Sequence, residues 1–140
     1  AVIMRVVLDT NIMVSALLSP FSPAARIMTH WKKGTFVVVT SSEQITEVRE
    51  VSRYPKLAAI VPKHKFGEMI NRLWAAEVID DLPFVDEALD PEDTFLITLT
   101  VGGEANWLVT GDKRAGLLQR GIIGRAKVVT AREFCDYLEK

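Results

Sequence analysis

The sequence predicts an α/β fold: a three-layer α/β/α sandwich with a central parallel sheet. Short runs of β-branched residues alternate with longer stretches of helical period, which is the pattern of parallel strands connected by helices. Three of these runs are apolar at every position, as strands covered by helices on both faces must be. They are Val6 to Leu8, Phe36 to Val39, and Val128-Val129.

The elements of the amino-terminal half follow in a regular order. The first strand, residues 5–8, runs into Asp9 and then into a helix. A second helix is expected over 23–33, where Gly34 ends it, and it leads to a strand over 35–39. A third helix is expected over 42–51, because Ile45, Val48 and Val51 form one apolar stripe.

The second half continues the alternation. A helix is expected over 63–78, with apolar residues at helical spacing. Asp90 followed by Pro91 predicts another helix start, since Asp is a favoured N-cap and proline is favoured at the first helical position. Strands over 107–110 and 127–130, each followed by a helix, complete the chain. Trp31, Trp74 and Trp107 fall at core spacing, so we expect all three in the core.

Length and composition set the frame for function. A chain of 140 residues, 49% hydrophobic and 25% charged, is typical of one globular domain, here residues 1–140, and excludes a disordered or collagen-like chain. Its net charge of -1 gives no global basic field, so nucleic-acid binding requires a local patch. One cysteine, Cys135, allows no internal disulfide, which favours a reducing, cytoplasmic setting. No apolar run is long enough for a membrane span.

Acidic residues stand where strands end or helices begin. Asp9 directly follows the first strand, and Asp112 follows the strand at 107–110. Glu47 lies on the helix that Thr40-Ser41-Ser42 opens, and Asp93 lies in the first turn after Asp90-Pro91. Because ligands of open α/β sheets bind at the carboxyl ends of the strands, these acids are candidate site residues.

A cluster of carboxylates predicts a divalent cation. Two carboxylates roughly 4 Å apart repel by about 4 kcal/mol at a surface-like dielectric, so a fold that keeps a cluster needs a counter-charge. Oxygen ligands without His or Cys favour a hard ion, Mg²⁺ or Mn²⁺, and magnesium often completes its shell with substrate phosphate. The implied chemistry is phosphodiester hydrolysis by a metal-activated water.

These residues resemble the PIN domain ribonucleases, in particular the toxins of prokaryotic toxin-antitoxin (VapC-like) systems. The resemblance rests on Val-Leu-Asp9-Thr-Asn, Glu47 in its helix, Asp93 in Glu-Asp-Thr-Phe-Leu-Ile, and Val-Thr110-Gly-Asp112-Lys, and it covers essentially the whole chain. It implies that Asp9, Glu47, Asp93 and Asp112 bind Mg²⁺ or Mn²⁺ and catalyse cleavage of single-stranded RNA. One departure is visible, because Arg114-Ala115-Gly116 stands where many toxins carry a further acid and a phenylalanine.

The resemblance also implies supporting residues and partners. Asn11 and Thr110 match polar positions that brace the site in relatives. A cognate antitoxin and a second copy of the chain are the partners implied, and no membrane is. The alternative is a non-catalytic metal- or RNA-binding module of the same fold, which metal-dependent cleavage by the purified protein would exclude.

Each acid also has a purely structural interpretation. Asp9 can cap the helix that follows it, and Asp93 can complement the helix dipole as a first-turn acid. Glu47 can belong to a solvated face, and Asp112 can be a turn residue. Glu43 is expected in a capping box with Thr40 rather than in the site, and Glu92 as a solvated first-turn acid.

The substrate-binding residues do not follow from the motifs. Short basic runs on helix ends are solvated faces by default. If RNA binds, Arg49, Arg53 and Lys56, near the Glu47 helix, are the first candidates for its phosphates, and Lys113 beside Asp112 is a further one.

Overall fold

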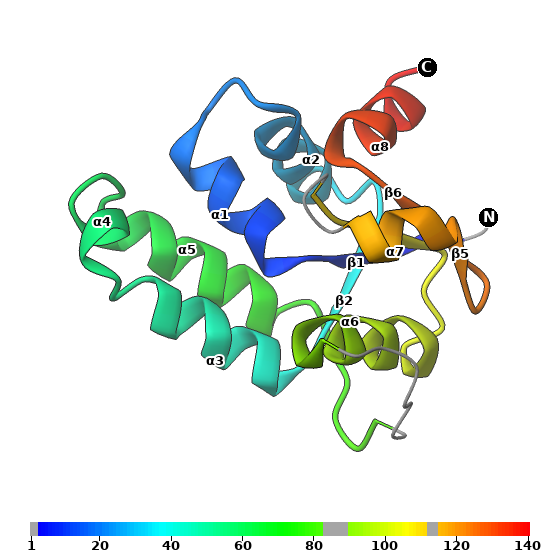
Figure 1. Ribbon diagram of the computed structural model, residues 1–140. Helices are drawn as coiled ribbons and strands as arrows, with labels where there is room; N and C mark the ends of the chain where they lie inside the picture. Colours follow the sequence, from blue (N-terminus) through cyan, green and yellow to red (C-terminus); the bar gives the residue numbers. More distant parts are fainter. Residues whose placement is uncertain (1–2, 83–89, 112–114) are drawn as a thin grey trace.

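In the computed structural model, which describes residues 3–82, 90–111 and 115–140, the chain folds around one central sheet (Figure 1). The strand order is β3-β2-β1-β4-β6-β5, with β5 antiparallel to β6 and every other pair parallel. The strands are β1 (Arg5–Leu8), β2 (Val37–Thr40), β3 (Glu77–Val78), β4 (Trp107–Val109), β5 (Ile122–Ile123) and β6 (Ala126–Val129). The helices are α1 (Thr10–Leu18), α2 (Pro23–Lys32), α3 (Ser42–Val51), α4 (Pro55–Ala58), α5 (Lys63–Trp74), α6 (Pro91–Gly102), α7 (Ala115–Arg120) and α8 (Ala131–Leu138).

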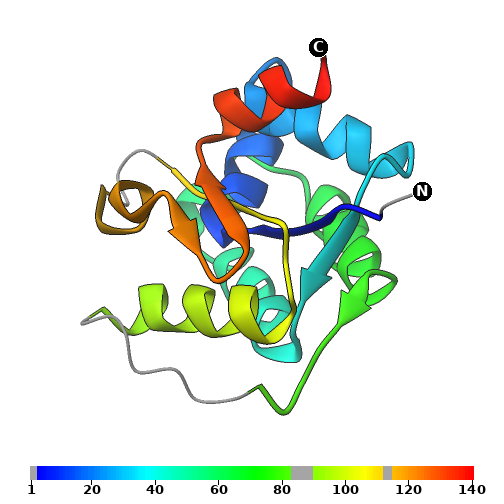
Figure 2. The same cartoon turned by 90° about the vertical axis from the view of Figure 1, so that its right-hand side faces the viewer.

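Two apolar cores separate the layers, which confirms the predicted three-layer sandwich. Side chains alternate across β1, so Val6 and Leu8 enter one core and Val7 the other. The first core is closed by α1, α2, α3, α5 and α8, and the second by α6 and α7. Figure 2 shows α1, α2 and α8 on one side of the sheet and α6 on the other.

The helix that carries Glu47 begins differently from the expectation. The N-cap of α3 is Ser41, whose hydroxyl accepts from the backbone N–H of Gln44 at 3.2 Å. The capping box expected between Thr40 and Glu43 is therefore wrong: Thr40 is the last residue of β2, and its hydroxyl donates to the side chain of Gln44. A complete capping box occurs instead at Thr130 and Glu133, where α8 starts.

Two short strands were not expected. The helix expected over 63–78 ends at Trp74, and Glu77–Val78 pairs with β2 as an edge strand. At the other edge, Ile122–Ile123 forms a hairpin with β6, bracketed by Gly121 and Gly124 at φ of 70° and 59°. Runs of two residues carry no readable alternation, so sequence period alone does not reveal such strands.

The expectation for the tryptophans is wrong at one position. Trp31 is 8% exposed and belongs to the first core, and Trp107 is partly buried against it. Trp74 is 49% exposed, because the buried stripe of α5 runs through Phe66, Met69 and Leu73 and ends one residue before it.

Among the described residues, no single helix combines the length and the hydropathy of a membrane span. Only α1 and α2 taken together meet these criteria, across a bend of 101°.

Candidate active site at the carboxyl edge of the sheet

The ends of the two central strands hold a buried carboxylate. Leu8 of β1 pairs with Val109 of β4, so the residues that follow them, Asp9 and Thr110, lie side by side. The backbone N–H of Asp9 continues the ladder by donating to the Val109 carbonyl at 2.9 Å. Asp9 is 2% exposed and Thr110 is fully buried. The sheet register therefore places a carboxylate and a hydroxyl together at this edge.

Asp9 is oriented from two sides. Its Oδ1 accepts from the backbone N–H of Asn11 at 3.1 Å, and its Oδ2 accepts from the hydroxyl of Thr110 at 2.8 Å. The first bond makes Asp9 the N-cap of α1, as its structural interpretation requires. The second bond, from Thr110, has no part in capping the helix. Since a carboxylate offers about four lone-pair positions, these two bonds alone do not saturate it.

Asn11 and Thr110, the two expected bracing residues, act in different ways. Thr110 holds Asp9 with its side chain, whereas Asn11 holds it with its backbone N–H. The Asn11 residue itself is exposed.

A buried amide ties α3 to the strand that carries Asp9. Gln44 is fully buried, and its Nε2 donates to the carbonyl oxygen of Leu8 at 2.7 Å. Its Oε1 accepts from the hydroxyl of Thr40 at 2.5 Å, so both ends of the amide are satisfied. The amide thereby links the carboxyl ends of β1 and β2 through the first turn of α3.

Glu47 lies one turn further along α3 and is also held. Its Oε1 accepts a hydrogen bond from the hydroxyl of Thr10, the residue after Asp9. Two side chains of α3, Gln44 and Glu47, thus bond the residues on either side of Asp9. Glu47 is half-buried and points to α1, so it does not belong to a fully solvated face.

The direction of α6 brings Asp93 to the same edge. Arg5, the first residue of β1, donates from Nη2 to the carbonyl of Gly103 at 2.7 Å, which places the end of α6 beside the start of β1. A Cβ on Gly103 would lie 2.6 Å from Val39, so only glycine permits this approach. The twelve residues of α6 span about 18 Å, and the helix therefore starts near the opposite, carboxyl edge.

Figure 1 shows the first turns of α1, α3 and α6 at one end of the sheet. The expected start of α6 is confirmed, because Asp90 accepts from the N–H groups of Glu92 and Asp93 and Pro91 is the first helical residue. Asp93 is half-buried, and Glu92 is exposed.

The fourth expected acid, Asp112, and Lys113 lie outside the described residues. Within the described ranges, no three Asp, Glu, His or Cys side chains are spaced closely enough to hold one ion. Asp9 and Glu47 are thus hydrogen-bonded to neighbouring residues, and Asp93 lies at the same edge of the sheet. The three carboxylates do not form a metal-ligand cluster in the part of the chain that the structure describes.

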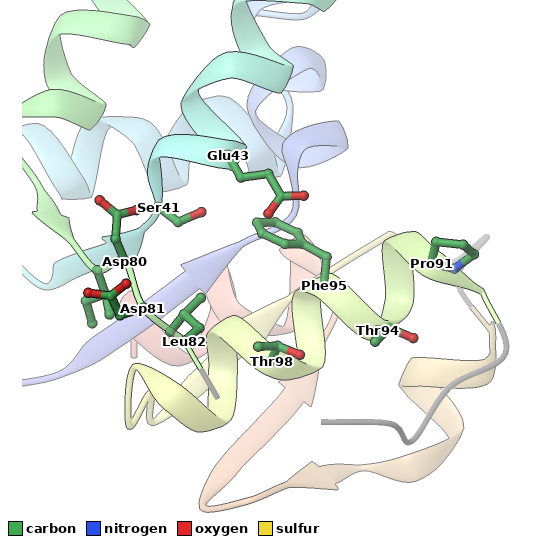
Figure 3. Close-up of a pocket in the computed structure, with 10 residues that line it drawn as sticks. Ser41, Glu43, Asp80, Asp81, Leu82, Pro91, Thr94, Phe95 and Thr98 are labelled. Carbon is green, nitrogen blue, oxygen red and sulfur yellow. The ribbon is translucent and has the colours of Figure 1, made fainter. Parts of the chain in front are cut away.

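A hollow of about 410 Å³ lies beside this edge, between the start of α3 and the first turns of α6 (Figure 3). Three carboxylates, Glu43, Asp80 and Asp81, line it with the ring of Phe95. Asp80 also has a structural role, because it accepts from the backbone N–H and the hydroxyl of Ser42 at the first residue of α3. Phosphate is repelled by such a lining.

The motifs did not reveal Gln44 and Thr10, although one signal was available for Gln44. It lies four residues before Val48, on the apolar side of the helix that also carries Ile45. A polar residue at such a position must find buried partners, which is what Gln44 does.

Comparisons with known proteins agree with this fold. A family model described as PIN domain matches residues 5–114. This chain superposes on a chain of the crystal structure of VapBC2 from Rickettsia felis, which is bound to a DNA fragment from the VapBC2 promoter. The TM-score is 0.59 at 20% sequence identity, and the match covers 91% of this chain and 98% of that chain. At this identity the likeness shows the fold. No curated protein matches the chain.

Proposed function

The chain belongs to the PIN domain family, and we propose that it is a metal-dependent endoribonuclease that hydrolyses phosphodiester bonds of single-stranded RNA. The observation that carries the proposal is Asp9, a carboxylate 2% exposed at the carboxyl edge of the sheet. Burying an anion is costly unless hydrogen bonds or a cation compensate it. A residue needed only as an N-cap does not require the second hydrogen bond, which the Thr110 hydroxyl donates to Asp9 Oδ2.

The donor set fits a hard divalent ion. The candidate ligands Asp9, Glu47, Asp93 and Asp112 are all carboxylates, which suit Mg²⁺ or Mn²⁺. When bound, such an ion neutralises the phosphate and lowers the pKa of an attacking water.

The chain's own residues orient the acids before any ligand arrives. Thr110 and the N–H of Asn11 fix the Asp9 carboxylate, and Thr10 fixes Glu47. Gln44 donates to the Leu8 carbonyl and so ties the backbone next to Asp9 to α3. Groups held in place before reaction lose little entropy in reaching the transition state.

Cleavage of a labelled single-stranded RNA by the purified protein tests the proposal. We expect cleavage with Mg²⁺ or Mn²⁺, none with EDTA, and a large loss in both Asp9→Asn and Asp93→Asn. The amide keeps the shape of the side chain but removes the anion that would hold the cation. The matched control is Glu92→Gln, the exposed neighbour of Asp93, for which we expect a mild effect.

Circular dichroism and melting temperature should show that the variants fold. Cleavage that persists in Asp9→Asn, or that resists EDTA, would come from another ribonuclease and would leave the catalytic role of this site without support. If metal-dependent cleavage were absent from the wild type, the chain would have to be a non-catalytic binding module.

We further propose that the protein is the toxin of a toxin-antitoxin pair, acting in the cytoplasm with a cognate antitoxin as partner. The support is the resemblance of its motifs to VapC-like toxins and the fold shared with the Rickettsia felis VapBC2 structure. Induced expression of the wild type in bacteria should arrest growth, and Asp9→Asn should not. Growth arrest by both proteins would mean that toxicity does not come from this site. Sedimentation of the purified protein would decide whether it is also a homodimer.

A further inference from the structure

A concentration of positive charge lies at one end of the molecule. Residues 49–65 contain five basic residues and one acidic residue, Glu50, in a chain whose net charge is -1. We call these five residues, which stand at the end of α3, in and around α4 and at the start of α5, the basic end: Arg49, Arg53, Lys56, Lys63 and Lys65. Figure 1 shows that α3 and α5 lie side by side and that α4 joins them at the end remote from the sheet.

All five cations of the basic end are exposed. None of them takes part in the ion pairs found among the described residues, which join Arg5 to Glu77 and Glu139 to both Arg26 and His30. Like charges within about 10 Å repel at ordinary salt. A surface that keeps five cations together without carboxylate partners is suited to a polyanion.

An exposed aromatic side chain lies among the cations of the basic end. Tyr54, between Arg53 and Lys56, is 56% exposed. Its backbone is fixed, because its N–H donates to the Val51 carbonyl at 3.0 Å and its own carbonyl accepts from Leu57 and Ala58. The ring is therefore presented from a rigid turn. Cations together with aromatic rings on which bases stack are the means by which proteins bind single-stranded nucleic acids.

The basic end is connected to the candidate active site by one helix. Glu47 and Arg53 are six residues apart along α3 and the turn that follows it, which corresponds to about 9 Å at the rise of a helix. A strand whose scissile phosphate lies at Asp9 and Glu47 reaches the basic end within a few nucleotides. On the other side of the start of α3 lies the acidic hollow, which repels phosphate.

We propose that the basic end binds the phosphates of single-stranded RNA on one side of the scissile bond, and that Tyr54 stacks on one of its bases. This proposal rests on the proposed ribonuclease function, and it names the surface that takes the substrate. Positive charge on one side of the site and the carboxylates of the acidic hollow on the other give the bound strand a single path along α3.

The test measures binding of a labelled single-stranded RNA, about twelve nucleotides long, in the Asp9→Asn background with EDTA, so that cleavage does not interfere. The test variant is Arg53→Gln with Lys56→Gln. The control is Lys33→Gln with Lys140→Gln, which removes two exposed cations outside the basic end and so makes the same change in net charge. Melting temperatures should show that each variant is folded.

We expect the test variant to weaken binding and to flatten its salt dependence. Each phosphate contact on a single strand contributes about 0.7 to the slope of log K against log salt, so losing two should lower it by about 1.4. The control should leave the slope within error. An unchanged slope in the test variant, or an equal change in the control, would overturn the proposal.

Two further variants test the proposed stacking of Tyr54 on a base. Tyr54→Ala should weaken RNA binding about 5-fold or more, whereas Tyr54→Phe, which keeps the ring, should bind like the parent protein. Equal affinity of all three proteins would overturn the assignment of Tyr54.

Cleavage assays separate this proposal from the function on which it rests. If the function holds, the basic-end variant in the wild-type background should raise KM for the twelve-nucleotide RNA while kcat stays near that of the wild type. A wild-type protein that binds RNA through the basic end but never cleaves it would contradict the ribonuclease function alone. Metal-dependent cleavage with a KM that ignores the basic-end variant would contradict this inference alone.

Discussion

At the residue scale, the candidate site depends on Asp9 being both buried and held. Thr110 is fully buried, and its hydroxyl donates to Asp9 Oδ2 at 2.8 Å. A hydrogen bond to a charged group stabilises the fold by about 1.5–3 kcal/mol, more than a bond between neutral groups. Thr110 therefore contributes to the stability of the fold and to the orientation of the carboxylate.

Replacement of Thr110 separates these contributions. Thr110→Val keeps the shape of the side chain but removes the donor, so we expect unfolding in urea to show a loss of about 1–3 kcal/mol and RNA cleavage to fall. Thr110→Ser keeps the hydroxyl and should retain most of the activity. If the valine variant cleaved RNA as well as the serine variant, Thr110 would have no part in positioning Asp9.

Residue by residue, the sequence reveals the ends of strands better than the contacts made there. Asp9 and Thr110 follow strands that period and composition predict, so their convergence could be expected from the sheet alone. The bonds of Gln44 to Leu8 and of Glu47 to Thr10 join residues 36 and 37 positions apart. Such pairs depend on how α3 packs on α1, which no local pattern specifies.

At the element scale, the long periodic segments were predicted well and the shortest strands were missed. The helix over 42–51 has the expected bounds, and the strands at 5–8 and near 107 and 127 were found. For the strand Glu77–Val78 the sequence predicts the end of a helix, because Ala75-Ala76 favours helix and two residues show no alternation. The helix Pro91–Gly102 was predicted from its start, since the N-cap Asp90 and Pro91 mark it.

Two helices far apart in sequence, α2 and α8, are joined by an ionic cluster. The Glu139 carboxylate after α8 bonds to His30 Nε2 at 2.9 Å and to the guanidinium of Arg26, both on α2. These two bonds lower the pKa of Glu139 from its ordinary value of 4.5 to about 2, and the bond to His30 has the larger effect. Beside the cluster, burial raises the pKa of the Cys135 thiol, so this cysteine is expected to be unreactive.

This cluster predicts acid sensitivity. Because the pKa of Glu139 is lower in the folded chain, its contribution to stability is complete above about pH 4.5 and is lost as the pH falls toward 2. Glu139→Gln should therefore reduce the melting temperature at pH 7 and change it little near pH 2. Thermal melts between pH 2 and 7 measure the difference, and Glu68→Gln, at an exposed position on α5 away from the cluster, is the control for general charge loss. A difference between wild type and Glu139→Gln that did not change with pH would contradict the assignment.

At the scale of the whole molecule, the fold places the candidate-site carboxylates and the basic end apart. The parallel strands and the return of α6 direct carboxylates from different parts of the chain to one edge of the sheet, while the cations of the basic end lie at the far end of α3 and α5. The acids repel one another at that edge without a cation. Stability of the whole domain should therefore respond to divalent ions.

Metal binding gives the last prediction. An ion that binds only the folded chain stabilises it by about 2.7 kcal/mol at a hundred times its dissociation constant, which raises the melting temperature by several degrees. Mg²⁺ or Mn²⁺ should thus raise the melting temperature of the wild type. Asp9→Asn should lose most of this increment, because the substitution removes the anion that would hold the cation. Glu92→Gln should keep the increment. Equal increments in wild type and Asp9→Asn would mean that the ion binds elsewhere on the surface, and no increment in the wild type would leave the carboxylates without the cation that their arrangement predicts.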